Sequence, residues 1–156
     1  MSNSPKANLE KNGVTLPTPV APVANYVTYV RTGNLISVSG QLPLDNDGKL
    51  PYVGKVGQEV SAEDANKAAR LCAINIISQV NAALDGDLDR VVRIVKLGAF
   101  VNCTDSFAGQ PAIVNGASDL MVEIFGDKGK HSRSAVGTNA LPLNVPVEID
   151  ALIEVS

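Results

Sequence analysis

The segment Val147–Val155, VEIDALIEV, decides the fold class because its side chains alternate in character. Every odd-numbered position is apolar, and the even-numbered positions are acidic except Leu152. Successive side chains of a β-strand point to opposite faces, so this period of two predicts a strand with one apolar and one half-polar face. We expect the apolar face to pack on helices, while Glu148 and Asp150 point away toward solvent or another subunit.

Two segments upstream have the pattern of amphipathic helices. Ser61–Asp64 has the form of an N-terminal capping box, and small and apolar residues then recur at three- and four-residue steps as far as Ala83. Pro111–Phe125 carries its apolar residues on one face and is followed by Gly126, a residue common just past a helix end. Both helices need an apolar surface on which to pack.

The remaining regular segments are predicted to be strands. They are Val27–Arg31 and Leu35–Ser39, joined by a turn at Thr32–Asn34, then Val91–Val101 and a segment near Ser134–Gly137. Asp45–Gly57 predicts a loop with at most one brief edge strand, and Leu141–Pro142 a turn. The order ββ(β)αβαββ favours an α+β fold, with both helices on one face of a single sheet.

Residues 1–25 differ from the rest in composition and are rich in proline, asparagine and serine. The run LPTPVAPVA predicts an extended conformation, because a residue that precedes proline avoids the helical region. We therefore predict an extended N-terminal arm over residues 1–25 and a single domain over residues 26–156. Whether the arm covers a neighbouring subunit or stays mobile is left open by the sequence.

Composition excludes several classes of function. The 156 residues are 45% hydrophobic and 19% charged, as in a globular domain, and the net charge of -3 disfavours nucleic acid as the main partner. Cys72 and Cys103 lack the spacing of a metal site and are expected to be buried thiols. No apolar run reaches the roughly 20 residues that span a bilayer, and no secretory signal is evident. We expect a cytoplasmic protein with no membrane partner.

Candidate chemistry centres on Arg133. The chain has one histidine and no GxSxG, HExxH, Walker or GxGxxG pattern, so common nucleophile, zinc and nucleotide sites have no support. One arginine that holds a carboxylate is compatible with this inventory, because a guanidinium group matches a planar anion. A surface arginine at the entrance to a strand is the alternative that the residues alone leave open.

The segment from Arg133 to Ala151, R-S-A-V-G-x-x-x-L-P-x-x-x-x-V-E-I-D-A, resembles the signature of the RidA/YjgF family. These are the reactive-intermediate deaminases, also labelled endoribonuclease L-PSP-like. Tyr26, Gly33–Asn34 and Ser39–Gln41 resemble the N-terminal hairpin of the family, so the similarity extends over residues 26–155. The arm, and extra residues between Phe107 and Asn115, resemble a longer RidA-like branch.

The resemblance implies a chorismate-mutase-like fold assembled as a homotrimer, with the sheets inward and a ligand cleft at each subunit interface. It also implies hydrolytic deamination of 2-imino or enamine acids to 2-keto acids and ammonia, without a cofactor or metal. Arg133 would hold the substrate carboxylate and Glu148 would place the attacking water. Many active members have cysteine at the position of Ala135, where the backbone carbonyl orients the water.

Four further residues are implied to contact substrate: Tyr26, Ser39, Gly40 and Asn115, with Ser39 and Gly40 in a loop beside the ligand. Each polar candidate has a simpler alternative. Tyr26 is equally well an interface tyrosine, Glu148 a solvated strand carboxylate and Asn115 a helix residue satisfied by solvent or backbone. His131 is interpreted as a loop residue near the cleft mouth that tunes substrate choice, in preference to a catalytic acid.

Two other functions stay open at this point. A trimeric protein could bind or sense a small carboxylate, such as a 2-keto acid, through Arg133 without turning it over. A ribonuclease or translation inhibitor is the third hypothesis, and the acidic composition argues against it.

Overall fold

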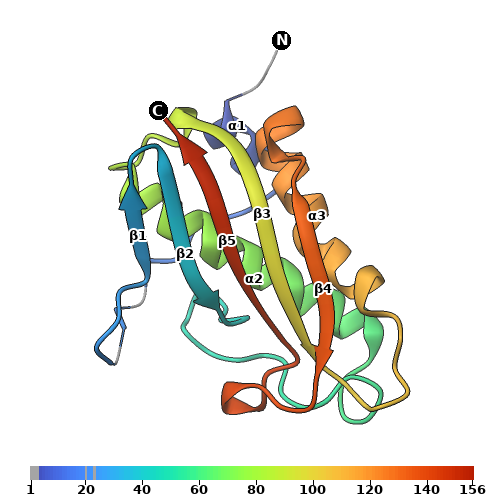
Figure 1. Cartoon of the computed structure of the whole chain (residues 1–156). Helices are drawn as coiled ribbons and strands as arrows, with labels where there is room; N and C mark the ends of the chain where they lie inside the picture. Colours follow the sequence, from blue (N-terminus) through green and yellow to red (C-terminus); the bar gives the residue numbers. More distant parts are fainter. Residues whose placement is uncertain (1–3, 20, 23) are drawn as a thin grey trace.

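A computed structural model describes residues 4–156 except 20 and 23, and it contains one five-stranded sheet. The strands are β1 (Tyr29–Thr32), β2 (Leu35–Gln41), β3 (Val91–Asn102), β4 (Ser132–Thr138) and β5 (Val147–Val155), in the spatial order β1-β2-β5-β3-β4 (Figure 1). The β3–β4 pair is parallel and the other pairs are antiparallel. The α+β prediction is confirmed, and β5 has the predicted bounds.

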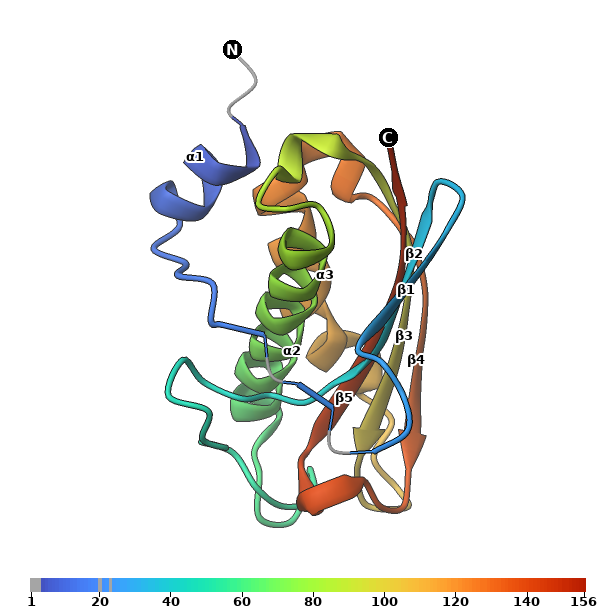
Figure 2. The ribbon, with the colours of Figure 1, turned by 90° about the vertical axis from the view of Figure 1, so that its left-hand side faces the viewer.

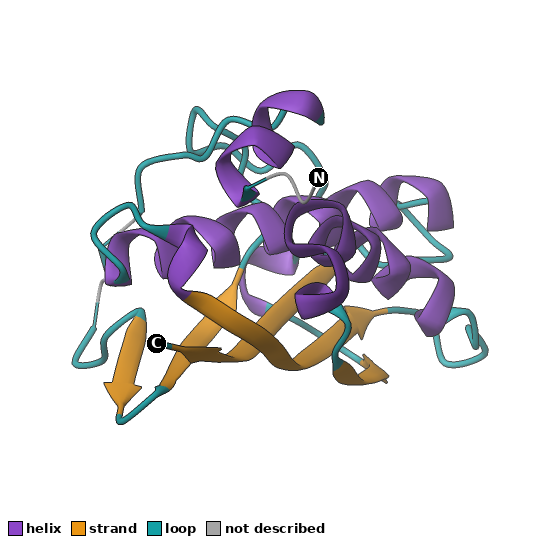
Figure 3. Cartoon of the chain, turned by 90° about the horizontal axis from the view of Figure 1, so that it is seen from above, coloured by secondary structure: helices purple, strands orange, loops and turns teal. Residues whose placement is uncertain are grey.

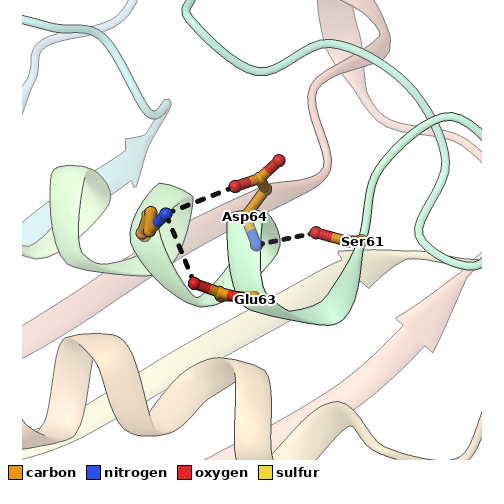
Figure 4. A network of polar contacts seen from close by, with 4 residues as sticks. Ser61, Glu63 and Asp64 are labelled. Atoms are coloured by element: carbon orange, nitrogen blue, oxygen red, sulfur yellow. Dashed lines mark hydrogen bonds and ion pairs between the residues drawn. The ribbon is translucent and has the colours of Figure 1, made fainter.

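Two long helices, α2 (Ala62–Ala83) and α3 (Gln110–Phe125), cover the same face of the sheet (Figures 2 and 3). The Ser61 hydroxyl accepts a hydrogen bond from the Asp64 backbone N–H at 3.1 Å, which confirms the predicted cap. Lys67 pairs with Glu63 and Asp64 on the exposed side of this first turn (Figure 4). The α3 helix ends at Phe125 and is followed by Gly126, whose φ of 61° suits glycine.

The hydrophobic core fills the space between this sheet face and the helices. All five odd-numbered side chains of β5 are buried, as their alternation predicts, and so are both cysteines. The two helices approach closely at Gly116, where a Cβ atom would overlap the carbonyl oxygen of Asn66. The opposite face of the sheet carries no helix among the described residues, and side chains on it include Phe100 and Val136.

The prediction of an extended arm is wrong for its first part, because Pro5–Lys11 forms helix α1. Ser4 caps this helix through a bond from the Ala7 N–H, and Pro5 starts it, which is the position where a helix tolerates proline. The prolines behind the prediction come later in the chain. Leu9 is buried and Asn8 donates to the carbonyl of Ile124 at 2.9 Å, so the helix packs on the end of α3 in its own chain.

Other differences concern loops and strand ends. Asp45–Gly57 is a loop, with bridges from Val56 to Val60 and to Cys103. The β4 strand begins at Ser132, earlier than expected, so Arg133 lies inside the strand and not ahead of it. Ser39 and Gly40 lie in β2, where its register to β5 shifts, and not in a loop. Among the described residues, no helix has the length and apolar character needed to cross a membrane.

Candidate functional site

Arg133 lies on the edge strand β4 and faces helix α3. Its partner in the parallel register is Leu97, whose side chain is fully buried on the helix-covered face. The guanidinium Nη1 donates to the Ser118 hydroxyl at 3.0 Å, and Nη2 donates to the Pro111 carbonyl at 3.3 Å. Among the described residues, no Asp or Glu forms an ion pair with it. Arg133 is thus a half-buried cation held by neutral oxygens.

Asn115 and Ala135 lie near this guanidinium. Asn115 is four residues after Pro111 and three before Ser118, so all three share one face of α3. Ala135 lies two residues beyond Arg133 on the same side of β4 and packs partly on the core. We call Arg133, Ala135, Asn115 and Ser118 the arginine half-site. Sequence reasoning missed Ser118, although its helical spacing from Asn115 could have indicated it.

His131 joins the arginine half-site through Ser118. Its Nε2 atom lies 2.9 Å from the Ser118 hydroxyl oxygen, and its Nδ1 atom lies 2.6 Å from the carbonyl oxygen of Gly129. The histidine is therefore not a free group at a loop tip, and both ring nitrogens are engaged by the protein. The hydrogen bond between His131 and Ser118 does not involve the Pro111 carbonyl, which is the second acceptor of the Arg133 guanidinium.

Glu148 lies on the opposite face of the sheet. In the antiparallel register it pairs with Phe100, which in turn pairs with Val136, and both of these apolar side chains are more than 40% exposed. The Glu148 carboxylate lies over Gly40, where a Cβ atom would overlap its Oε1. Burial raises the pKa of the Glu148 carboxyl above its ordinary value, and the nearby Asp150 carboxylate raises it further.

Ser39 precedes Gly40 on β2, and Tyr26 precedes the segment to which Ser39 is bonded. The Ser39 hydroxyl donates to the Val27 carbonyl at 2.8 Å, and the Ser39 N–H donates to Thr28, so Ser39 fixes the segment that follows Tyr26. The Tyr26 side chain is 54% exposed. We call Tyr26, Ser39, Gly40 and Glu148 the carboxylate half-site.

The structure brings the seven residues singled out by sequence into two groups and does not join these groups within one chain. Through the ladder, Arg133 is level with Leu97 and Ala151, whereas Glu148 lies three residues away on β5. Two strand spacings of roughly 4.8 Å also separate β4 from β5. With side chains on opposite faces, Arg133 and Glu148 cannot hold one small molecule between them in a single chain.

A hollow of about 250 Å³ adjoins the arginine half-site at the end of β4. Its lining includes Gly137, two residues beyond Ala135, and Gln110, which precedes Pro111. The Gln110 amide donates to the Phe107 carbonyl at 2.8 Å and lies against the Cys103 sulfur. A larger hollow, between α1 and the end of α3, contains none of the residues of either half-site.

No group of three or more His, Cys, Asp and Glu side chains is placed to hold a metal ion in the described part of the chain. Burial raises the pKa of the Cys72 thiol well above its ordinary value, so this cysteine is a core residue and not a nucleophile.

Comparison with known proteins agrees with this fold. Residues 6–154 match the model of the YjgF/chorismate mutase-like endoribonuclease family. Protein TCP17 of Trypanosoma cruzi is 47% identical over 151 residues, which cover 96% of this chain and 93% of that protein. The chain belongs to the RidA/YjgF family.

Solved structures show the same relationship. Protein Atu1372 of Agrobacterium tumefaciens, described as of unknown function, has 45% identity and a TM-score of 0.92 over 97% of this chain and 92% of that chain. The YjgF gene product of E. coli has 28% identity and a TM-score of 0.64 over 90% of this chain and 94% of that chain. The chain therefore has the YjgF fold and lies structurally nearer to Atu1372 than to E. coli YjgF.

Proposed function

We propose that this protein hydrolyses reactive 2-imino or enamine acids to 2-keto acids and ammonia, in a cleft where two subunits meet. The observation that carries the proposal is Arg133, which helix α3 holds through two neutral oxygens and which pairs with no carboxylate of the described chain. A half-buried guanidinium of this kind has free N–H groups for a planar anion. The carboxylate of a 2-imino acid is such an anion.

The two half-sites support a composite cleft. The arginine half-site lies at the β4 edge and the carboxylate half-site on the bare sheet face, so each is open to a second copy of the chain. Apolar side chains on that face, Val30, Phe100 and Val136, are 52%, 41% and 45% exposed and would be buried by such a copy. We propose the homotrimer of the family, in which the arginine half-site of one subunit meets the carboxylate half-site of the next.

In this cleft Arg133 binds the substrate carboxylate and orients the imine carbon. Water adds to that carbon, so that a C–O bond forms as the C=N bond becomes single. The nitrogen takes up the proton that the water has lost, the C–N bond breaks, and ammonia leaves with the hydroxyl proton as the C=O bond of the 2-keto acid forms. Glu148 takes the proton of the attacking water, a role favoured by its raised pKa, and Ala135 contributes a backbone carbonyl.

The test is release of 2-oxobutyrate from freshly generated 2-iminobutyrate, compared with the uncatalysed rate. Arg133→Ala should weaken carboxylate binding by about 2 to 5 kcal/mol, the cost of truncating a buried charge pair, and abolish the acceleration. Arg133→Lys is the matched control for charge without the planar fork. If several 2-imino acids show no acceleration, the deaminase proposal is wrong.

A sensor of small carboxylates is the second candidate, because the arginine half-site is complete in one chain whereas Glu148 is not part of it. Assays of the wild type and of Glu148→Gln distinguish an enzyme from a sensor. For an enzyme, the substitution should abolish turnover while 2-oxobutyrate still binds. For a sensor, the wild type binds 2-oxobutyrate and accelerates no 2-imino acid. We do not propose ribonuclease activity, given the net charge of -3.

A further inference from the structure

We propose that Ser118 and His131 are positioning residues that set the orientation of the Arg133 guanidinium, through a chain of hydrogen bonds with one permitted direction. The inference rests on the proposed function, since it assigns the carboxylate-binding role to Arg133. The chain runs from the Gly129 carbonyl through the imidazole and the Ser118 hydroxyl to Nη1, with distances of 2.6, 2.9 and 3.0 Å.

The direction of each bond follows from which groups can donate. A carbonyl oxygen only accepts, so Nδ1 of His131 carries the proton that bonds Gly129. In the neutral imidazole Nε2 is then the acceptor, and the Ser118 hydroxyl donates its single proton to it. The Ser118 oxygen is left to accept, which is what a guanidinium N–H requires. Every group in the chain therefore has one assigned role.

The loop before β4 anchors the start of this chain. Gly129 is buried against α3, so closely that a Cβ atom would overlap the carbonyl oxygen of Met121. Only glycine allows this contact, and it holds the Gly129 carbonyl beside the imidazole. Because Ser118 and Met121 lie on the same helix, α3 holds both ends of this series of hydrogen bonds.

The consequence for Arg133 is that the plane of its guanidinium group has a fixed orientation. Ser118 holds one terminal nitrogen and the Pro111 carbonyl holds the other, so two of the five guanidinium N–H groups are engaged by α3. Without Ser118 the guanidinium can turn about its remaining contact. A rotating fork binds a carboxylate less well, because part of the binding free energy is then spent on ordering the side chain.

The first experiment measures 2-oxobutyrate binding by calorimetry in a double-mutant cycle. Ser118→Ala should raise Kd about five- to tenfold, the effect of losing one hydrogen bond of ordinary strength. Ser118→Thr retains a hydroxyl and should restore most of the affinity. In an Arg133→Ala background, Ser118→Ala should have no further effect, because it acts only through Arg133. Additive losses would mean that Ser118 contacts the ligand directly, and would overturn the inference.

The histidine is tested with a matched pair of variants. His131→Gln can present an amide oxygen near the position of Nε2, whereas His131→Leu removes the acceptor. We expect binding near the wild-type value for His131→Gln and weakened about fivefold for His131→Leu. Ser132→Ala is the control, since Ser132 is next to His131 but its hydroxyl donates to the Val95 carbonyl and takes no part in this hydrogen-bond chain. Equal affinity in the Gln and Leu variants would contradict the assigned role.

A measurement without ligand keeps the two proposals separate. Nitrogen NMR of the wild type should show the Nδ1–H tautomer of His131, and the Arg133 side-chain signals should broaden or average in Ser118→Ala. An Nε2–H tautomer overturns the inference even if the protein is a deaminase. If the tautomer is as assigned and 2-oxobutyrate does not bind, the proposed function fails and the hydrogen-bond chain stands.

Discussion

Arg133 and Glu148 belong to the same sheet, but their side chains project from opposite faces of it. Arg133 is bonded to α3 on the helix-covered face, and Glu148 lies over Gly40 on the bare face. A catalytic site that uses both residues must therefore take them from different subunits. Whether the two residues act from different subunits can be tested by mixing mutant subunits, without a structure of the assembly.

Mixed trimers should recover activity that neither parent has. Arg133→Ala and Glu148→Gln proteins are each expected to be inactive. Co-expressed with different tags and purified through both, they can form two kinds of mixed ring. In a ring with head-to-tail contacts either kind contains one intact cleft in three, so turnover of about a third of the wild-type value is expected. Inactive mixed trimers would place both residues in one chain's site.

Gly40→Ala tests the contact between β2 and Glu148. The new methyl group would overlap the Glu148 carboxylate, a flexible group that can turn aside, so stability should change little. The general base would be displaced, however, and small displacements of a catalytic group cost up to about a hundredfold in rate. We expect kcat to fall at least tenfold with KM within about threefold. A rise in KM alone, with kcat unchanged, would argue against Glu148 as the base.

The sequence predicts the fold well because its dominant signals are local. The alternation of Val147–Val155 and the Ser61 cap each determine one element, and both are confirmed. The α1 helix was missed because the later prolines of the arm outweighed the Ser4–Pro5 start signal. Helical spacing could have placed Ser118 beside Asn115, but its hydrogen bond to Arg133 could not be predicted, since that bond depends on how α3 lies against β4. The family signature marks Arg133 and is silent on what orients it.

A fall in pH should have opposite effects on activity and on stability through Glu148. Burial and Asp150 raise the Glu148 pKa, so the folded protein binds this proton more tightly than the unfolded chain does. The carboxyl therefore lowers stability as pH rises from its unfolded pKa through its raised folded pKa. Turnover has the opposite trend, because the base must be ionised, and should fall as pH drops through the raised pKa. Unfolding and kcat profiles over the same pH range check both signs.

Glu148→Gln should accordingly be more stable than the wild type near neutral pH and inactive. At acid pH, where the wild-type carboxyl is protonated, the difference in unfolding free energy should shrink. Lys96→Met is a useful comparison. Burial raises the pKa of Asp150 and the Lys96 ammonium group opposes this shift, so removal of Lys96 should raise that pKa further and leave Glu148 in place. If Glu148→Gln destabilises the protein equally at all pH values, ionisation of the Glu148 carboxyl does not lower stability and the expected linkage is wrong.

Gly116→Ala tests the helix packing that supports the arginine half-site. A Cβ atom at this position would overlap the Asn66 carbonyl of α2, which is backbone and cannot move aside cheaply. We expect a loss of about 1 to 3 kcal/mol in the free energy of unfolding, typical of overpacking. Val122→Ala, on the exposed side of α3, is the control and should change it by at most about 0.5 kcal/mol. Because α3 carries Pro111 and Ser118, any Gly116→Ala protein that still folds should also bind 2-oxobutyrate more weakly. Unchanged affinity together with the expected loss of stability would show that the half-site tolerates a shift of the helix.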